Sequence, residues 1–216
     1  MRIISIDPGE YSTKFLAIES KKKSCDILFH AIENSEDVNL NKILGNYLGG
    51  ASAKLYKLAL VFPEHLTNTR TISLPVKSKK KAEQLIPFQI EDSLPTPLSE
   101  THYTSSITVN KDSCDAFVSI VKKSDFDTTI NKYSHLTIPL AHVTSMGCLL
   151  SNYFHLNKML GNYCVIDVGH SSTKVYLFKK GNLVQLHKSF CAGKMMTQAI
   201  AEFYKKSNIN LIDEEE

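Results

Sequence analysis

The chain has 216 residues, 43% of them hydrophobic and 22% charged, which is the composition of an ordinary globular protein. A formal net charge of +3 is too small to indicate a nucleic-acid partner by itself. Residues 1–19 alternate in polarity and carry Asp7, Lys14 and Glu19, which excludes a secretory signal there, and no uninterrupted apolar stretch is long enough to span a bilayer. The five cysteines are odd in number and form no CxxC pair, so the sequence predicts reduced thiols in a cytosol-like compartment.

The first 62 residues predict three strands, a helix and a fourth strand. Residues 36–49 place apolar side chains on one helical face and end in Gly49-Gly50, which predicts a helix. The apolar run KLALVF is followed at once by Pro63, which predicts a short buried strand. The expected elements, in order, are strands at 2–7, 13–19 and 25–32, the helix over 36–49 and the strand at 57–62.

The middle of the chain predicts a small α/β subdomain inserted into this series. A basic cluster, KSKKK, precedes an amphipathic helix that Pro87 interrupts and that Pro95 and Pro97 close. Two alternating runs flank NKDS, which predicts a β-hairpin. The expected elements are an extended segment at 69–75, a helix over 82–94, hairpin strands at 103–109 and 115–121, and a helix capped by Ser124 that runs to about Tyr133.

The last part of the chain restarts the opening series. A long helix is expected first, with apolar side chains such as Leu140, Leu149 and Tyr153 buried along one face. Three strands and a further helix then follow, as in the first half. The expected elements are the helix over 140–158, strands at 163–168, 173–178 and 183–190, and a helix from near Gly193 to about Lys206. The chain stops at NINLIDEEE, where another element of the series is expected.

Two segments 160 residues apart repeat nearly the same sequence, IISIDPGEYSTKFLAIE at 3–19 and YCVIDVGHSSTKVYLF at 163–178. Each copy has an apolar run, an aspartate, a glycine two places on, Ser-Thr-Lys, and a second apolar run. The matched pairs are Asp7 with Asp167, Gly9 with Gly169, Ser12 with Ser172, Thr13 with Thr173, and Lys14 with Lys174. A single Asp-x-Gly is ordinary in a hairpin turn, but its duplication in the same context is a strong signal of function.

An Asp-x-Gly turn between two strands suits a phosphate chain. The turn supplies backbone N–H groups that point into one concavity, and glycine lets the backbone approach the phosphate closely. Lys14 offers a cation for a phosphate oxygen, and hydroxyl donors stand at Ser12, Thr13, Ser171, Ser172 and Thr173. Asp7 and Asp167 predict the site of Mg²⁺ or its waters, since that cation prefers oxygen ligands. Two such hairpins facing each other would hold a nucleotide between two pseudo-symmetric halves.

The pair of hairpins resembles the two phosphate-binding hairpins of the actin-like ATPases. Asp7, Gly9 and Lys14 match the spacing of the first hairpin of actin, and Asp167, Gly169 and Thr173 match the second. Within that superfamily the chain most resembles the PilM and GspL branch, assembly proteins of type IV pili and type II secretion that are related to FtsA. The stretches that carry this resemblance are RTISLPVKSKKKAEQLIPFQIEDSLPTPLSETHYTSSI, FVSIVKKSDFDTTINKYSHLTIPLAHV and FCAGKMMTQAIAEFY.

The resemblance implies an α/β, actin-like (ribonuclease H-like) fold of duplicated mixed-sheet domains, with a small inserted α/β subdomain and the last subdomain missing from this chain. The implied division is 1–75 with 136–160 as the first actin-like subdomain, 76–135 as the insert and 161–216 as the second subdomain, truncated. It also implies bound ATP with Mg²⁺ and little turnover. The expected ligand-binding residues are Asp7, Gly9, Ser12, Thr13, Lys14, Asp167, Gly169, Ser171, Ser172, Thr173 and Gly193, with Asp7 and Asp167 on the metal.

The implied partners are the cytoplasmic N-terminal tail of a PilN-like membrane protein and the pilus or secretion assembly ATPase, with no nucleic acid. The implied location is cytoplasmic and peripheral to the inner membrane, reached only through partners or through sequence outside this chain. Self-association as a homodimer is left open. The inserted subdomain, with its basic cluster, is where we expect the membrane-protein tail to bind.

Two departures from the family pattern affect these expectations. Family members have a Gly-Gly pair where Ala192-Gly193 stands, which weakens the expected approach of the phosphate. Enzymes of this superfamily that hydrolyse ATP position a water with a polar side chain at the start of the helix expected near residue 140. His142 is the candidate there, although a structural histidine is an equally good interpretation.

Three alternatives remain at the level of sequence. A RuvC-type nuclease shares the DPG after the first strand but needs three or four clustered carboxylates for two metals, and only Asp7 and Asp167 are placed for it. A sugar or acetate kinase shares the hairpins but needs a catalytic aspartate and a substrate pocket that are not visible. A nucleotide-independent docking domain of the GspL type is favoured by the early end of the chain, while the intact hairpins favour nucleotide binding.

Overall fold

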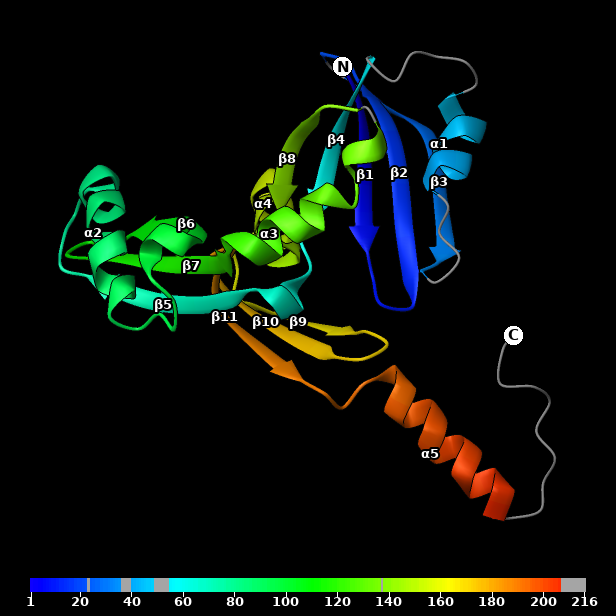
Figure 1. Cartoon of the computed structure of the whole chain (residues 1–216). Helices are drawn as coiled ribbons and strands as arrows, with labels where there is room; N and C mark the ends of the chain where they lie inside the picture. The colour runs from blue at the N-terminus through cyan, green and yellow to red at the C-terminus, as the bar shows by residue number, and fades with distance from the viewer. Residues whose placement is uncertain (23, 36–39, 49–54, 137, 207–216) are drawn as a thin grey trace.

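The computed structural model describes residues 1–22, 24–35, 40–48, 55–136 and 138–206 (Figure 1). They form three sheets, with strand orders β3-β2-β1-β4-β8, β5-β7-β6 and β11-β10-β9. Among these residues, no helix is long and apolar enough to cross a membrane. The start of the helix predicted over 36–49, its Gly49-Gly50 end and the final NINLIDEEE lie outside the described residues.

The first sheet contains the first copy of the sequence repeat. Strands β1 (Arg2–Pro8), β2 (Ser12–Ser20) and β3 (Cys25–Asn34) form an antiparallel meander, and β4 (Tyr56–Val61) joins β1 in parallel. Helix α1 (Leu40–Leu48) lies beside β3 (Figure 1) and packs Leu44 into the core of this sheet. Alternate residues of the strands, such as Ile4, Ile6, Phe15 and Ala17, are buried there, as the period of two in the sequence predicts.

The second sheet forms a layer of its own. Strands β5 (Asn68–Leu74), β6 (Thr101–Val109) and β7 (Cys114–Lys122) are antiparallel with β7 in the centre, and the 3-10 turns η2 (Glu64–Leu66) and η3 (Leu98–Glu100) precede β5 and β6. Helix α2 (Lys79–Glu91) covers one face with Ala82, Ile86 and Ile90, each 0% exposed. Strand β5 belongs to this sheet, although the sequence division placed it in the first subdomain.

The expected interruption of α2 is wrong, because the helix continues through Pro87. Its buried face on the sheet stabilises the helix enough to offset the hydrogen bond that the proline cannot donate. The expected cap of the next helix is also wrong. Helix α3 (Lys123–Asn131) begins directly after β7 with Lys122 at the N-cap, so Ser124 lies inside the helix, and η4 (Ser134–Leu136) follows it.

The single helix expected over 140–158 is wrong. Residues Leu140–Thr144 form strand β8, which joins the edge of β4 in parallel, and only Met146–Leu156 form helix α4. The side-chain hydroxyl of Ser145 accepts a hydrogen bond from the Cys148 N–H at 3.3 Å and so caps α4. The apolar spacing across 140–154 matches a helix only because a strand and a helix follow each other without a loop. Accordingly Leu140, Leu149 and Tyr153 are exposed, while Phe154 is buried.

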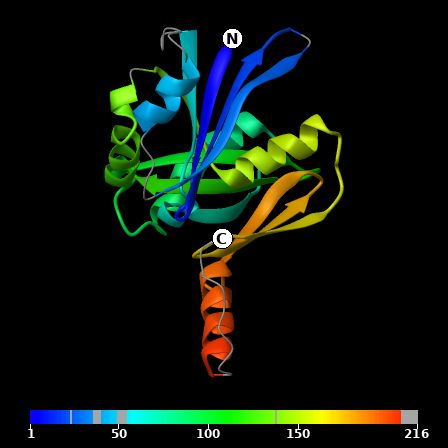
Figure 2. The same ribbon diagram turned by 90° about the vertical axis from the view of Figure 1, so that its right-hand side faces the viewer.

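The third sheet contains the second copy of the repeat. Strands β9 (Tyr163–Val168), β10 (Thr173–Lys179) and β11 (Asn182–Ser189) form an antiparallel meander, and α5 (Gly193–Lys206) follows it, as the sequence predicts. One face packs through Tyr176, Phe178 and Leu183 on Phe154 of α4 and on Phe117 of β7. Figure 2 shows this sheet below the β5-β7-β6 layer, with α5 extending away from the body.

Candidate ligand cleft between the two hairpins

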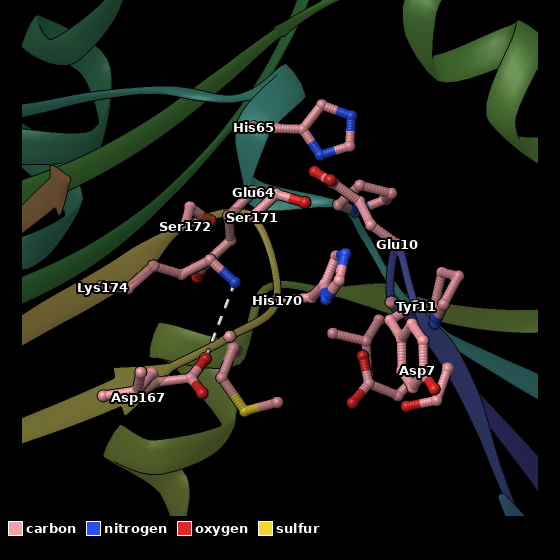
Figure 3. Close-up of a pocket in the computed structure, with 18 of the residues that line it drawn as sticks. Asp7, Glu10, Tyr11, Glu64, His65, Asp167, His170, Ser171, Ser172 and Lys174 are labelled. Carbon is pink, nitrogen blue, oxygen red and sulfur yellow. Dashed lines mark ion pairs between the residues drawn. The ribbon is translucent and has the colours of Figure 1, made fainter. Parts of the chain in front are cut away.

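A cleft of about 580 Å³ lies between the two copies of the repeat. The β1–β2 turn lines one side and the β9–β10 turn lines the other (Figure 3), and the segment after β4 and the start of α4 complete the lining. Eight of the eleven residues predicted to bind the ligand line this cleft: Asp7, Gly9, Ser12, Lys14, Asp167, Gly169, Ser171 and Ser172. The fold therefore brings together two groups of side chains that are 160 residues apart in sequence.

The two turns have the same backbone geometry. The Gly9 N–H donates to the Ser12 carbonyl at 3.1 Å, and the Gly169 N–H donates to the Ser172 carbonyl at 3.0 Å. A Cβ atom at Gly9 would lie 2.5 Å from the Ser12 oxygen, and one at Gly169 would lie 2.8 Å from the Ser172 oxygen. Glycine is therefore required at both positions to close the turn, whether or not a phosphate binds there.

Each hairpin places a lysine opposite its aspartate. Asp7 is the cross-strand neighbour of Lys14, with 3.5 Å between Oδ2 and Nζ, and Asp167 is the neighbour of Lys174, with 3.6 Å between the same atoms. Figure 3 shows the second of these ion pairs. Lys14 is more than half exposed, so the first pair contributes little to stability and its ammonium remains available to an anion.

The donor set fits a hydrated magnesium ion that also binds phosphate. Asp7 and Asp167 present carboxylates from opposite sides of one cleft, and Mg²⁺ in nucleotide sites uses one or two carboxylates together with waters and phosphate oxygens. Among the described residues, no group of three or more His, Cys, Asp or Glu side chains is placed to hold a metal ion. That finding does not support the two-metal nuclease alternative, which needs such a group.

Three of the predicted residues do not line the cleft but support the hairpins that do. Thr13 is buried, and its hydroxyl lies 3.0 Å from that of Ser35. Thr173 donates its hydroxyl to the Cys191 carbonyl at 2.6 Å. The Gly193 N–H donates to the Gly169 carbonyl at 3.0 Å, and a Cβ atom at Gly193 would lie 3.3 Å from that oxygen. Thr173 and Gly193 thus join the second turn to the segment that leads into α5.

A residue outside the predicted set, Glu64, places a buried carboxylate at the cleft and is 5% exposed. Its Oε2 accepts a hydrogen bond from the Tyr176 hydroxyl at 2.5 Å, and its Oε1 accepts one from the Gly147 N–H at 3.2 Å. Glu64 thereby connects the end of β4 with the first turn of α4 and with β10. Nothing in the sequence marks it, since its partners are 83 and 112 residues away.

Two ionisable groups around Glu64 have shifted pKa values. Burial, and then the Glu64 carboxylate, raise the pKa of Tyr176 well above its usual range, so its hydroxyl stays protonated and donates. Burial lowers the pKa of Lys188, whose ammonium donates to the backbone carbonyls of Glu64 and Thr67. These contacts hold β10 and β11 against the segment that follows β4.

His142 is not at the cleft. It lies exposed on strand β8 and does not line the cleft, so the suggestion that it positions a water at a helix N-terminus is corrected. The residue that does begin α4 beside the cleft is Met146.

A second, mostly apolar groove of about 260 Å³ lies between the first two sheets. It is lined from β6 and β7 on one side and from Phe62 and the end of β8 on the other. Phe126 of α3 stacks on Phe62 at 5.7 Å between ring centroids and meets the His102 ring edge-on at 4.9 Å. Phe62 also lines the cleft, so the two cavities share a wall.

Solved structures share the fold of this chain. A chain of the PilM–PilN type IV pilus biogenesis complex superposes with a TM-score of 0.73 at 14% identity, over 95% of this chain and 66% of that one. The cytoplasmic domain of EpsL, an inner-membrane component of the type II secretion system of Vibrio cholerae, superposes with a TM-score of 0.60 at 9% identity. That match covers 100% of this chain and 79% of the EpsL chain. Neither a family model nor a curated protein matches the sequence.

The fold is actin-like. At 14% and 9% identity these comparisons establish the fold and nothing further. They confirm the predicted duplicated α/β fold, and they confirm that it resembles the fold of PilM and of the EpsL cytoplasmic domain. The chain described here spans 66% of the length of the chain that it matches in the PilM–PilN complex.

Proposed function

We propose that this protein binds Mg-ATP in the cleft between its two hairpins. The observation that supports the proposal is the convergence of two matching Asp-x-Gly turns, each with a lysine opposite the aspartate, on one cavity. Lys14, Ser12, Ser171, Ser172 and the backbone of the two turns would hold the phosphates. Asp7 and Asp167 would hold Mg²⁺ or its waters, and the ion would neutralise part of the phosphate charge.

We expect little or no hydrolysis. Of the described side chains at the cleft, Glu64 is the buried carboxylate, and both of its oxygens already accept hydrogen bonds from Gly147 and Tyr176. Both carboxylate oxygens are thus already engaged by protein donors rather than directed at an attacking water. The protein is then at most a weak ATPase, and its role is to present a nucleotide-dependent surface to partners.

The proposed partners belong to an inner-membrane platform for type IV pilus or type II secretion assembly. PilM is named together with PilN in a pilus biogenesis complex, and EpsL is a component of the secretion machinery. By analogy we propose that this chain works in the cytoplasm at the inner membrane as a scaffold that docks the cytoplasmic tail of a PilN-like protein and the assembly ATPase. The groove at Phe62 and Phe126 is mostly apolar and has a volume of about 260 Å³, which suits a short peptide with apolar anchors.

Titration calorimetry tests nucleotide binding. Wild-type protein should bind Mg-ATP, and the variant that combines Lys14→Ala with Asp167→Ala should show no measurable heat. Lys80→Ala, a change on the exposed side of α2 away from the cleft, should bind as wild type does. If the wild type does not bind Mg-ATP, the remaining proposal is a docking domain that works without nucleotide.

Peptide docking is tested separately. A synthetic peptide with the N-terminal tail sequence of a PilN-like protein from the same genome should bind wild-type protein and lose at least tenfold in affinity with Phe126→Ala. Affinity that is unchanged by Phe126→Ala, or by deletion of residues 77–135, would remove the groove from the proposal.

A further inference from the structure

The tips of the two hairpins touch each other through a pair of rings. Tyr11 of the first turn and His170 of the second turn stack with 4.9 Å between ring centroids and 23° between ring planes. Both residues line the cleft, and both remain exposed to solvent, Tyr11 to 56%. Figure 3 shows the two side chains pointing toward each other across the opening.

The ring pair occurs where the repeat stops matching. Ser12, Thr13 and Lys14 have identical counterparts, whereas Glu10 corresponds to His170 and Tyr11 to Ser171. The matched positions face the proposed phosphate site or hold the strands, and the unmatched positions Tyr11 and His170 supply a ring contact between the two turns.

Each ring is carried by a tip that is fixed to its own half of the molecule. The Tyr11 carbonyl accepts from the Ser35 N–H at 2.8 Å, and the Ser35 hydroxyl donates to the Gly9 carbonyl at 2.7 Å. The His170 carbonyl accepts from the Lys194 N–H at 2.9 Å at the start of α5. Because neither tip can swing freely, a separation of the two halves must break the ring pair.

We propose that Tyr11 and His170 form a clamp that positions the two hairpins around the phosphate chain and slows its release. This inference rests on the proposed binding of Mg-ATP. A bound polyphosphate is held by residues of both hairpins, so it dissociates when the hairpins move apart, and that movement also breaks the stack. Neither residue belongs to the repeated Asp-x-Gly pattern, so the clamp is an addition to the phosphate site.

The test is the rate at which a fluorescent ATP analogue with Mg²⁺ leaves the protein when it is displaced by excess unlabelled ATP in a stopped-flow instrument. Tyr11→Ala and His170→Ala should each release the analogue about two- to tenfold faster, the effect expected from the loss of one aromatic pair. Tyr11→Phe keeps the ring and should release it as wild type does. Tyr153→Ala is the matched control, since Tyr153 is 55% exposed and lies outside the cleft.

The double variant Tyr11→Ala/His170→Ala decides whether the rings act as a pair. If they do, it should release the analogue no faster than either single variant, because the first change already removes the contact. Effects that multiply would assign the rings independent contacts with the nucleotide and overturn the clamp. Normal binding with wild-type release rates in the single variants would also overturn the clamp and leave the proposed function standing. No binding in any variant, wild type included, would overturn both.

Discussion

At the scale of single residues, Glu64 connects several elements around the cleft. Its carboxylate accepts from Tyr176 and Gly147, and its backbone carbonyl accepts from Lys188 and from Thr67. A buried carboxylate is costly unless it is paired with donors, and here two donors from different elements satisfy it. The carboxylate also meets the N-terminus of α4 through the Gly147 N–H, where the helix dipole favours a negative charge.

Glu64→Ala is therefore expected to lower the free energy of unfolding by about 3 kcal/mol, because it leaves the Tyr176 hydroxyl and the Gly147 N–H without their acceptor. Glu64→Gln keeps the shape and one acceptor oxygen and should cost about half as much. Urea denaturation of both variants measures the difference. Equal stability of the Ala variant and the wild type would show that water satisfies both donors as well as the carboxylate does.

At the scale of the elements, the repeated hairpin is a unit with one internal requirement. Each turn closes through a hydrogen bond from its glycine, at Gly9 and at Gly169, and each leaves less than 3.0 Å for a Cβ atom. Gly45, inside helix α1, has nothing within 4 Å of the position its Cβ would take. The same substitution should thus have opposite effects in the two kinds of element.

Gly9→Ala and Gly169→Ala are each expected to destabilise the protein by about 2 kcal/mol, since a backbone carbonyl must shift to admit the methyl group. Gly45→Ala should stabilise it by about 0.5–1 kcal/mol, because alanine loses less backbone entropy in a helix. Thermal unfolding of the three variants provides the comparison. A destabilised Gly45→Ala, or an unchanged Gly169→Ala, would contradict this account of the turn.

At the scale of the whole molecule, strand β7 is packed on both faces. Cys114, Ala116, Val118 and Ile120 pack toward α2, while Phe117 packs on the opposite face with Phe154 and Tyr176. The Thr71 hydroxyl adds a hydrogen bond to the Val184 carbonyl of β11 at 2.6 Å. The second sheet is thus attached to the third, which carries half of the cleft, as well as to the first.

Phe117→Ala should consequently lower the free energy of unfolding by about 3–5 kcal/mol, the range for deleting a buried aromatic ring. Phe88→Ala, the same change at a side chain 69% exposed on α2, should stay within about 0.5 kcal/mol of wild type. Chemical denaturation of both, with the nucleotide affinity of Phe117→Ala as a second readout, tests whether the second sheet supports the cleft. A Phe117 variant as stable as the Phe88 variant would show that the sheets are not packed as one body.

The sequence by itself determined the duplication and therefore most of the fold. An alternating apolar pattern records which face of a strand is buried, and this pattern together with the Asp-x-Gly turns predicted both meanders, with each strand end within two residues of its observed place. The same repeat identified eight residues of the cleft before any geometry was known. Local signals of this kind suffice when neighbours in sequence are also partners in space.

The tertiary structure alone decided the contacts between distant segments. Residues 140–144 form a strand because β4 offers an unpaired edge. Helix α2 continues through Pro87 because its buried face rests on a sheet. Glu64 is central because α4 and β10 bring hydrogen-bond donors to its carboxylate. The stacking of Tyr11 on His170 likewise depends on how two halves of the chain approach each other. Such contacts have no signature in a local stretch of sequence, since each partner is an ordinary residue until packing places the other beside it.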